Sequence, residues 1–84
     1  MKVKVKGIYK HFKGDYYIVE DIAKDCEDLG DIVIYRGLYG DSPLWARKYD
    51  SFASKVDKEK YPDVLQEYKF ELQSIPSKRK RFWA

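Results

Sequence analysis

The feature that most constrains the fold is the spacing of apolar residues over the first fifty positions. Four short segments there have the period-two alternation, or the β-branched and aromatic residues, that are typical of strands: residues 2–6, 16–24, 32–39 and 44–48. Turn-forming residues separate the segments, and residues 7–9 either continue the first strand or turn a corner. No stretch before residue 50 has the periodicity of an amphipathic helix. The pattern predicts a mainly β domain, folded as a small antiparallel barrel or sandwich.

The last third of the chain fits two alternatives. Residues 50–56 predict a short helical turn, because two apolar residues there are four positions apart. Five apolar residues across 61–75 have helical spacing, whereas the strict alternation over 68–72 is typical of a strand. We expect a short turn at 62–66 and a fifth strand at 67–73, because a fifth strand would cover an otherwise exposed sheet edge.

The size and charge of the chain indicate one domain and a basic tail. With 84 residues, 17% of them aromatic, the chain can build one small core. The net charge is +3, but four cations lie together at residues 78–81, so residues 1–77 carry a net charge of −1. We therefore expect a barrel domain at residues 1–74 and a tail at 75–84. The tail is a candidate contact for nucleic acid or an anionic membrane through Lys78, Arg79, Lys80 and Arg81.

The cysteine content and the hydropathy pattern indicate a cytoplasmic protein. Cys26 is the only cysteine, so no disulfide can form within the chain and a reducing compartment is expected. No apolar run approaches the roughly 20 residues that cross a bilayer. The basic start of the chain is not followed by an apolar stretch, so it does not resemble a signal peptide.

No pattern in the sequence predicts catalysis, a metal or a cofactor. The single cysteine and single histidine are too few for the usual nitrogen and sulfur metal sites. The acidic residues at 25–31 lack the spacing of an EF-hand loop. Neither a phosphate-binding loop nor a dinucleotide-binding motif is present. We expect a protein that is not an enzyme.

The candidate binding residues are aromatic and cationic. Trp45 and Arg47 share one face of a strand, and Tyr39 is expected nearly opposite Trp45 across the turn at 40–43. An alternative is that Trp45 fills the core and Arg47 covers its ring. His11 precedes a turn, where it would either contact a ligand or hold the turn in place. The complete candidate set is Tyr9, His11, Tyr35, Tyr39, Trp45 and Arg47.

Rings beside a guanidinium group suit a flat, anionic partner. We expect a nucleotide, a nucleotide-derived signal or single-stranded nucleic acid. The alternative is a protein-interaction module that recognises a peptide through an aromatic groove, or that assembles with its own copies through a strand edge.

Several motifs, in order, resemble a bacterial and phage family, number 1653 among the domains of unknown function. They span about residues 7–72: Gly7-x-Tyr9-x-His11-Phe12-Lys13-Gly14, Tyr17-x-Val19, Val33-x-Tyr35-x-x-Leu38-Tyr39-Gly40, Trp45-x-Arg47, Phe52-x-x-x-Val56, Lys60-Tyr61-Pro62-Asp63 and Tyr68-x-Phe70-Glu71. The resemblance implies a small SH3-like antiparallel β-barrel of about five strands and favours the strand at 68–72. Lys48 stands where the family pattern has proline. The resemblance implies no activity.

Overall fold

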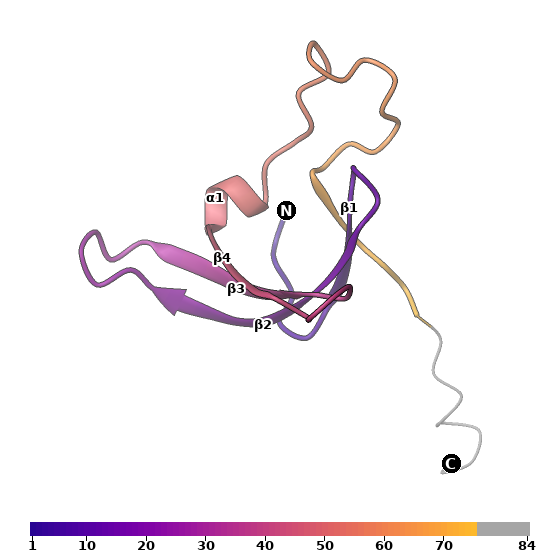
Figure 1. The fold of residues 1–84 in the computed structure, drawn as a ribbon. Coiled ribbons are helices and arrows are strands. Elements are labelled where there is room, and N and C mark those ends of the chain that lie inside the picture. Colours follow the sequence, from indigo (N-terminus) through magenta and orange to yellow (C-terminus); the bar gives the residue numbers. More distant parts are fainter. Residues whose placement is uncertain (76–84) are drawn as a thin grey trace.

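The computed structural model describes residues 1–75, which form one sheet of five antiparallel strands (Figure 1). The order across the sheet is β4-β3-β2-β1-β5. A single helical turn, α1, follows β4, at the place where the sequence predicted one. The bounds are β1 (Ile8–His11), β2 (Tyr16–Lys24), β3 (Asp31–Gly37), β4 (Leu44–Lys48), α1 (Tyr49–Phe52) and β5 (Phe70–Leu72). The mainly β class, the number of strands and the short helical turn are confirmed.

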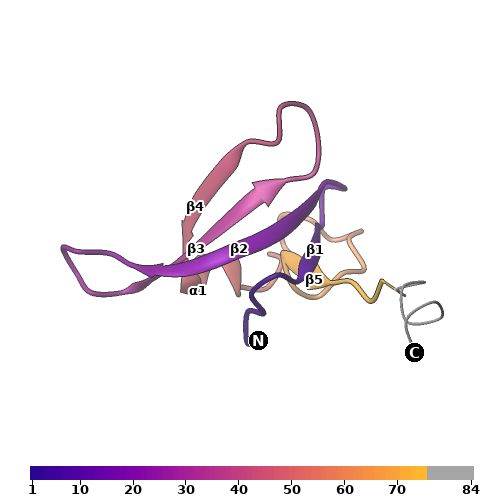
Figure 2. The ribbon, with the colours of Figure 1, turned by 90° about the horizontal axis from the view of Figure 1, so that it is seen from below.

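The sheet is strongly curved, but it does not close into a barrel. β1 and β5 rise steeply from the plane of β2, β3 and β4, and α1 lies over the inner face (Figures 1 and 2). β4 and β5 are the two edges of the sheet and do not pair with each other. The expected closed barrel is therefore an open one, in which α1 occupies the space between the two edges on the inner side.

A β-bulge changes which face of β2 is buried. The register with β3 shifts between Val19 and Asp21, so that Ile22 lies opposite Val33. A bulge reverses the alternation of side chains beyond it. Ile22 consequently packs against the core and Ala23 is exposed. A regular period-two alternation would place Ala23 on the face of Val19, whereas the bulge places Ile22 there instead.

The expected strand at residues 2–6 is a turn. The backbone N–H of Gly7 donates to the carbonyl of Lys4, 3.0 Å away, and Lys6 has a φ of 68°. Val3 is buried against the core, and its N–H donates to the hydroxyl of Tyr49. Side-chain hydroxyls thus satisfy backbone donors that a strand partner would otherwise satisfy. The alternation of valine and lysine reflects burial of Val3 alone, since Val5 is exposed.

The segment between α1 and β5 contains a turn and an isolated bridge. The N–H of Val64 donates to the carbonyl of Tyr61, and Lys55 bridges Tyr68. The strand expected at 67–73 is confirmed as the shorter β5, and the helical alternative for 61–75 is wrong. Leu65, one of the apolar residues with helical spacing, is 98% exposed. Its spacing therefore had no packing consequence.

The core is built from aromatic rings around Phe52. The ring of Phe52 stacks on Phe70 with 4.1 Å between centroids and 9° between planes. Its other neighbours are Tyr9 and Tyr35, at 5.4 and 5.2 Å in edge-to-face geometry. Because these rings come from β1, β3, α1 and β5, one side chain joins four elements. The buried core cluster is Val3, Tyr9, Val19, Val33, Tyr35, Phe52 and Phe70.

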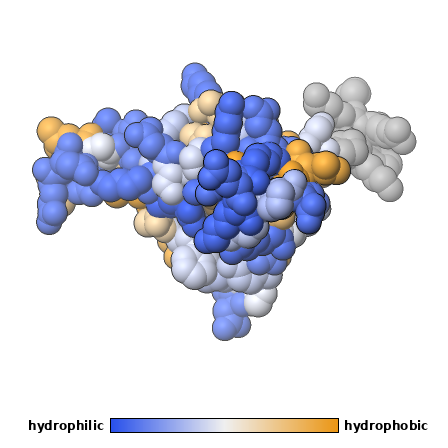
Figure 3. Space-filling view, turned by 90° about the horizontal axis from the view of Figure 1, so that it is seen from above, coloured by the Kyte–Doolittle hydropathy of each residue, from blue (hydrophilic) through white to orange (hydrophobic). Residues whose placement is uncertain are grey.

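The exposed face over α1 is largely hydrophilic, with small separate apolar patches (Figure 3). Within residues 1–75, no helix is long and apolar enough to span a membrane.

Replacing Phe52 with alanine is expected to destabilise the fold by about 3–5 kcal/mol, because it removes a fully buried ring and leaves a cavity. Urea unfolding followed by circular dichroism measures the loss. Leu65→Ala is the matched control and should change the free energy of unfolding by less than about 0.5 kcal/mol. Similar losses for the two variants would contradict the placement of Phe52 at the centre of the core.

Candidate binding site

The candidate residues on the strands face the same side of the sheet. In an antiparallel sheet, residues directly opposite one another share a face. Tyr35 lies opposite Trp45, and Arg47 lies opposite Val33 of the core. Toward the β5 edge of the same sheet, Tyr9 lies opposite Tyr17 and Leu72, and His11 lies opposite Phe70. The inner face therefore carries Tyr9, His11, Tyr35, Trp45 and Arg47 together.

Two of these residues belong to the core. Tyr9 is fully buried and Tyr35 is 4% exposed, and both pack edge-to-face on Phe52. The hydroxyl of Tyr9 accepts the backbone N–H of Lys4, 2.8 Å away. Their contribution to a binding site is to support the residues that are exposed beside them.

Trp45 and Tyr39 meet at the open part of the inner face. Trp45 is 46% exposed, so it is not a core-filling residue. Its indole N–H donates to the hydroxyl of Tyr39, 3.1 Å away. That hydroxyl is 3.4 Å from the hydroxyl of Tyr17, and the two tyrosine rings are perpendicular, with 5.6 Å between centroids. We call Tyr17, Tyr39 and Trp45 the ring platform.

Tyr17 was not among the candidate residues, although it is central to the platform. Burial, followed by the hydrogen bond with Tyr39, raises the pKa of Tyr17 well above its usual value. The hydroxyl therefore keeps its proton at all physiological pH values. No sequence pattern distinguishes Tyr17, because eight tyrosines are present and its contact with Tyr39 depends on the curvature of the sheet.

Arg47 is held in place by neutral partners. Its Nε donates to the hydroxyl of Tyr35 at 3.0 Å, and Nη1 donates to Oγ of Ser51 at 3.4 Å. The guanidinium lies over the ring of Phe70, 5.4 Å from the centroid. It thus covers a core ring, as the alternative for Arg47 proposed, but the ring is Phe70 instead of Trp45. Its positive charge is not neutralised by a carboxylate within residues 1–75.

His11 holds the turn between β1 and β2 and also borders the site. Its Nδ1 accepts the backbone N–H of Lys13 at 3.1 Å, and its ring packs on Phe70 with 4.8 Å between centroids. Because Nδ1 is an acceptor, the proton of the neutral imidazole is on Nε2. Burial, and then the charges of Arg47 and Lys13, lower the pKa of His11 below 6.5, while Asp15 opposes the shift.

A cavity of about 360 Å³ adjoins Arg47 and His11. We call it the basic cavity; its lining residues are His11, Phe12, Lys13, Arg47, Asp57, Lys60, Tyr61 and Lys69. Sequence reasoning did not select its three lysines. Lys13 follows β1, whereas Lys60 and Lys69 belong to residues 53–69, and the folding of that segment over β1 brings the three together.

His11 and Asp57 line the same cavity, and the side chain of each accepts hydrogen bonds from the backbone of its own turn. Oδ1 of Asp57 accepts the backbone N–H groups of Glu59 and Lys60, at 3.0 and 3.4 Å. Nδ1 of His11 is engaged by Lys13, and no hydrogen bond joins the two side chains in the described part of the chain. Each polar group stabilises its own turn. Within residues 1–75, no group of three or more potential metal ligands is gathered.

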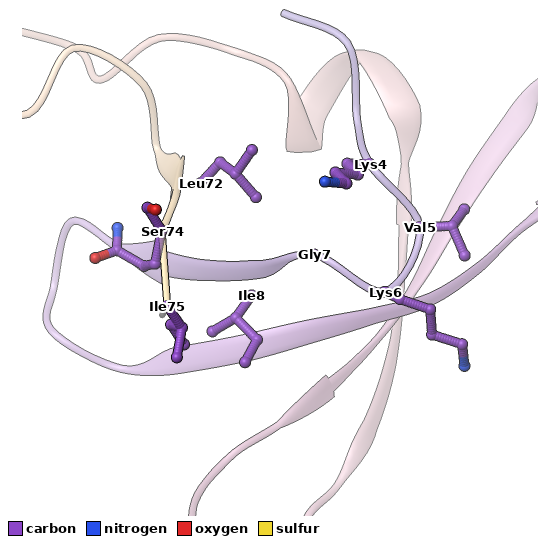
Figure 4. A pocket seen from close by; sticks show the side chains of 9 residues that line it. Lys4, Val5, Lys6, Gly7, Ile8, Leu72, Ser74 and Ile75 are labelled. Carbon is purple, nitrogen blue, oxygen red and sulfur yellow. The ribbon is translucent and has the colours of Figure 1, made fainter. Parts of the chain in front are cut away.

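A larger hollow of about 470 Å³ lies between residues 4–8 and 72–75. In Figure 4 the side chains of Ile8 and Ile75 lie close together, whereas Val5 and Lys6 point away from them. Lys6 pairs with Glu20 at 3.2 Å. This hollow offers aliphatic contacts without aromatic rings, and it contains none of the candidate residues.

Three acidic residues of the second quarter of the chain form ion pairs with lysines. Lys48 pairs with Asp25 at 2.8 Å and with Asp28 at 2.6 Å, and Lys24 pairs with Asp31 at 2.7 Å. These ion pairs partly neutralise the acidic residues at this end of the sheet. The tail residues Lys78, Arg79, Lys80 and Arg81 lie outside the described residues.

Gly37 is the position that the platform requires to be glycine. A Cβ built on Gly37 would lie 2.6 Å from Cε2 of Tyr39, closer than real carbon contacts. Gly37→Ala is therefore expected to displace Tyr39 and break its hydrogen bond with Trp45. In a Trp83→Phe background, the indole N–H proton of Trp45 should move upfield in the NMR spectrum. Tyr39→Phe, which removes only the hydroxyl, is the reference for a lost bond. An unchanged indole signal in Gly37→Ala would contradict this arrangement.

Comparison with known proteins identifies the family of the chain. The family described as "Protein of unknown function (DUF1653)" matches residues 7–83, which extends beyond the motifs found by inspection. No curated protein matches the chain. A crystal structure of a DUF1653 protein from Bordetella bronchiseptica has the same fold, with a TM-score of 0.68 and 24% sequence identity over 88% of this chain and 95% of that one. The resemblance noted in the sequence is thus confirmed: the chain belongs to the DUF1653 family of unknown function.

Proposed function

We propose that this domain is a non-catalytic binding module for a partner that carries a flat ring and a negative charge. The observation that carries the proposal is that Trp45, though 46% exposed, is fixed by its hydrogen bond to Tyr39. An exposed indole that is already oriented can stack on a ring without losing much side-chain freedom. Stacking of a nucleobase on an aromatic side chain contributes about 1–3 kcal/mol.

The negative charge of the partner would be met by Arg47. Arg47 lies two residues beyond Trp45 on the same face of β4, which is about 7 Å along a strand. Its hydrogen bonds to Tyr35 and Ser51 orient the guanidinium but leave its charge without a carboxylate partner among residues 1–75. A guanidinium in this state is suited to bind a phosphate or carboxylate group.

The partners with this chemistry are nucleotides, nucleotide-derived signals and single-stranded nucleic acid. All three present a ring and an anionic group on one molecule, and all occur in the cytoplasm, where we propose that the domain works. The exposed, unpaired Cys26 is compatible with a reducing compartment. The support for a binding role rather than a catalytic one is that His11 and Asp57 each serve a turn.

A peptide partner or a second copy of the chain is the alternative, and the outer edge of β4 favours it. β4 pairs only with β3 in the described part of the sheet, so an extended segment could add to its other side. Such a partner would be recognised through backbone hydrogen bonds, and its affinity would depend little on the indole of Trp45.

Trp45→Ala is expected to weaken the binding of a fluorescent oligothymidylate and of AMP by roughly 5- to 150-fold, the equivalent of about 1–3 kcal/mol of lost stacking. Fluorescence anisotropy and calorimetry measure the two affinities. Leu65→Ala, an exposed apolar truncation on the segment before β5, should leave both unchanged.

Two results would count against this function. One is unchanged affinity in Trp45→Ala, and the other is no measurable binding of either ligand by the wild-type chain. A salt dependence that disappears when residues 78–81 are deleted would instead assign oligonucleotide binding to the tail.

A further inference from the structure

We propose that the basic cavity binds a phosphate group, and that the ligand of this domain is consequently a phosphate ester whose ring rests on the ring platform. The part of the proposal that concerns the ring rests on the proposed function. The part that concerns phosphate rests on the cavity alone.

The basic cavity carries a net positive charge. Lys13, Lys60, Lys69 and Arg47 line it with one acid, Asp57. None of the four cations forms an ion pair within residues 1–75. Unpaired cations that share a concave surface concentrate positive potential and attract anions.

The distribution of acids over the rest of the molecule makes this concentration significant. Residues 1–77 carry a net charge of −1, so acids slightly outnumber cations there. The paired carboxylates are elsewhere, and they neutralise Lys6, Lys24, Arg36, Lys48 and Lys55. Of the eight cations of residues 1–75 that form no ion pair, four therefore line this one cavity.

The geometry of the lysines indicates a prepared site. Nζ of Lys13 lies 5.8 Å from the ring centre of Phe12 and 5.7 Å from that of Tyr61. Nζ of Lys60 lies 5.5 Å from the ring of Tyr61, and the two rings pack with 4.9 Å between centroids. The rings form a wall against which both ammonium groups rest, so their charges are held near the cavity without being neutralised.

His11 adds a neutral hydrogen-bond donor. Because its Nδ1 accepts from Lys13, its Nε2 carries the proton in the neutral form. Its surroundings from every side are Arg47 on β4, Lys13 and Asp15 in the turn, and Lys69 before β5. The three cations outweigh Asp15, and they and burial lower the pKa of His11. A bound phosphate would reverse the charge of this environment and raise the pKa.

The volume and the position of the cavity define the rest of the ligand. About 360 Å³ is the space of roughly twelve water molecules in the liquid, enough for a phosphate and the group that bears it. Arg47 lines the cavity and is also the second residue after Trp45 on the same face. A phosphate ester bound here would therefore direct its ring toward Trp45.

The experiment is an NMR titration of His11, which is the only histidine and gives an unambiguous signal. The pKa of His11 in the full chain is measured in inorganic phosphate and in chloride at matched ionic strength. We expect phosphate to raise the pKa. In Lys60→Gln/Lys69→Gln, phosphate affinity should fall about tenfold or more, because two charged hydrogen-bond donors are lost. Lys2→Gln/Lys4→Gln removes the same charge outside the cavity and should leave the affinity unchanged.

Two outcomes would overturn the proposal. One is a His11 pKa that is equal in phosphate and chloride, and the other is an equal loss of phosphate affinity in both lysine variants. Binding measurements with adenosine and with AMP distinguish failure of the phosphate site from failure of the proposed function. If adenosine and AMP bind with equal affinity, Trp45→Ala weakens both, and neither changes the pKa of His11, then the ring platform stands and the phosphate site fails. If phosphate shifts His11 but Trp45→Ala binds AMP normally, the phosphate site stands and the ring platform fails.

Discussion

The stack of Phe52 on Phe70 is the contact on which the rest of this structure depends. It joins α1, which follows one edge strand of the sheet, to β5, which is the other edge strand. Because β4 and β5 do not pair with each other, the curvature is held by aromatic packing on the inner face, together with the backbone hydrogen bonds between residues 54–56 and 67–69. Tyr9 and Tyr35 extend the same packing to β1 and β3. For a chain of 84 residues without a disulfide, a core of large rings is an efficient way to bury sufficient apolar area.

The same packing divides the inner face into a closed half and an open half. Phe52 and Val3 cover the closed half, while Trp45 and Arg47 lie where nothing of the described chain covers them fully. The polar groups of the open half are oriented by their neighbours in the core: the hydroxyl of Tyr35 accepts from Arg47, and the ring of Phe70 lies beneath the guanidinium. A surface built in this way keeps its shape before a partner arrives, which favours tight binding by a small number of side chains.

The sequence predicted β2, β3, β4 and β5, because their patterns follow directly from burial on one face, whereas β1 lies at residues 8–11 instead of the expected 2–6. The bounds of β2 and β4 agree with prediction, and the alternation over 68–72 correctly indicated β5. Three features depend on tertiary contacts and were missed: the bulge after Val19, the turn at residues 4–7 and the gathering of lysines around the basic cavity. Tyr39 and Trp45 do meet, but the expected register was wrong: Tyr35 lies opposite Trp45, and Tyr39 contacts the indole from the turn after β3. The role of Tyr17 needed the curvature of the sheet, which no local pattern encodes.

The most direct test of the account is to map amide chemical shifts of the full chain as AMP is added. If the open half of the inner face is the binding surface, the largest changes will fall at Tyr39, Trp45 and Arg47, with further changes at Lys13 and Lys69 around the basic cavity. Changes centred instead on residues 4–8 and 72–75, or confined to residues 76–84, would show that the partner binds elsewhere and would contradict the account.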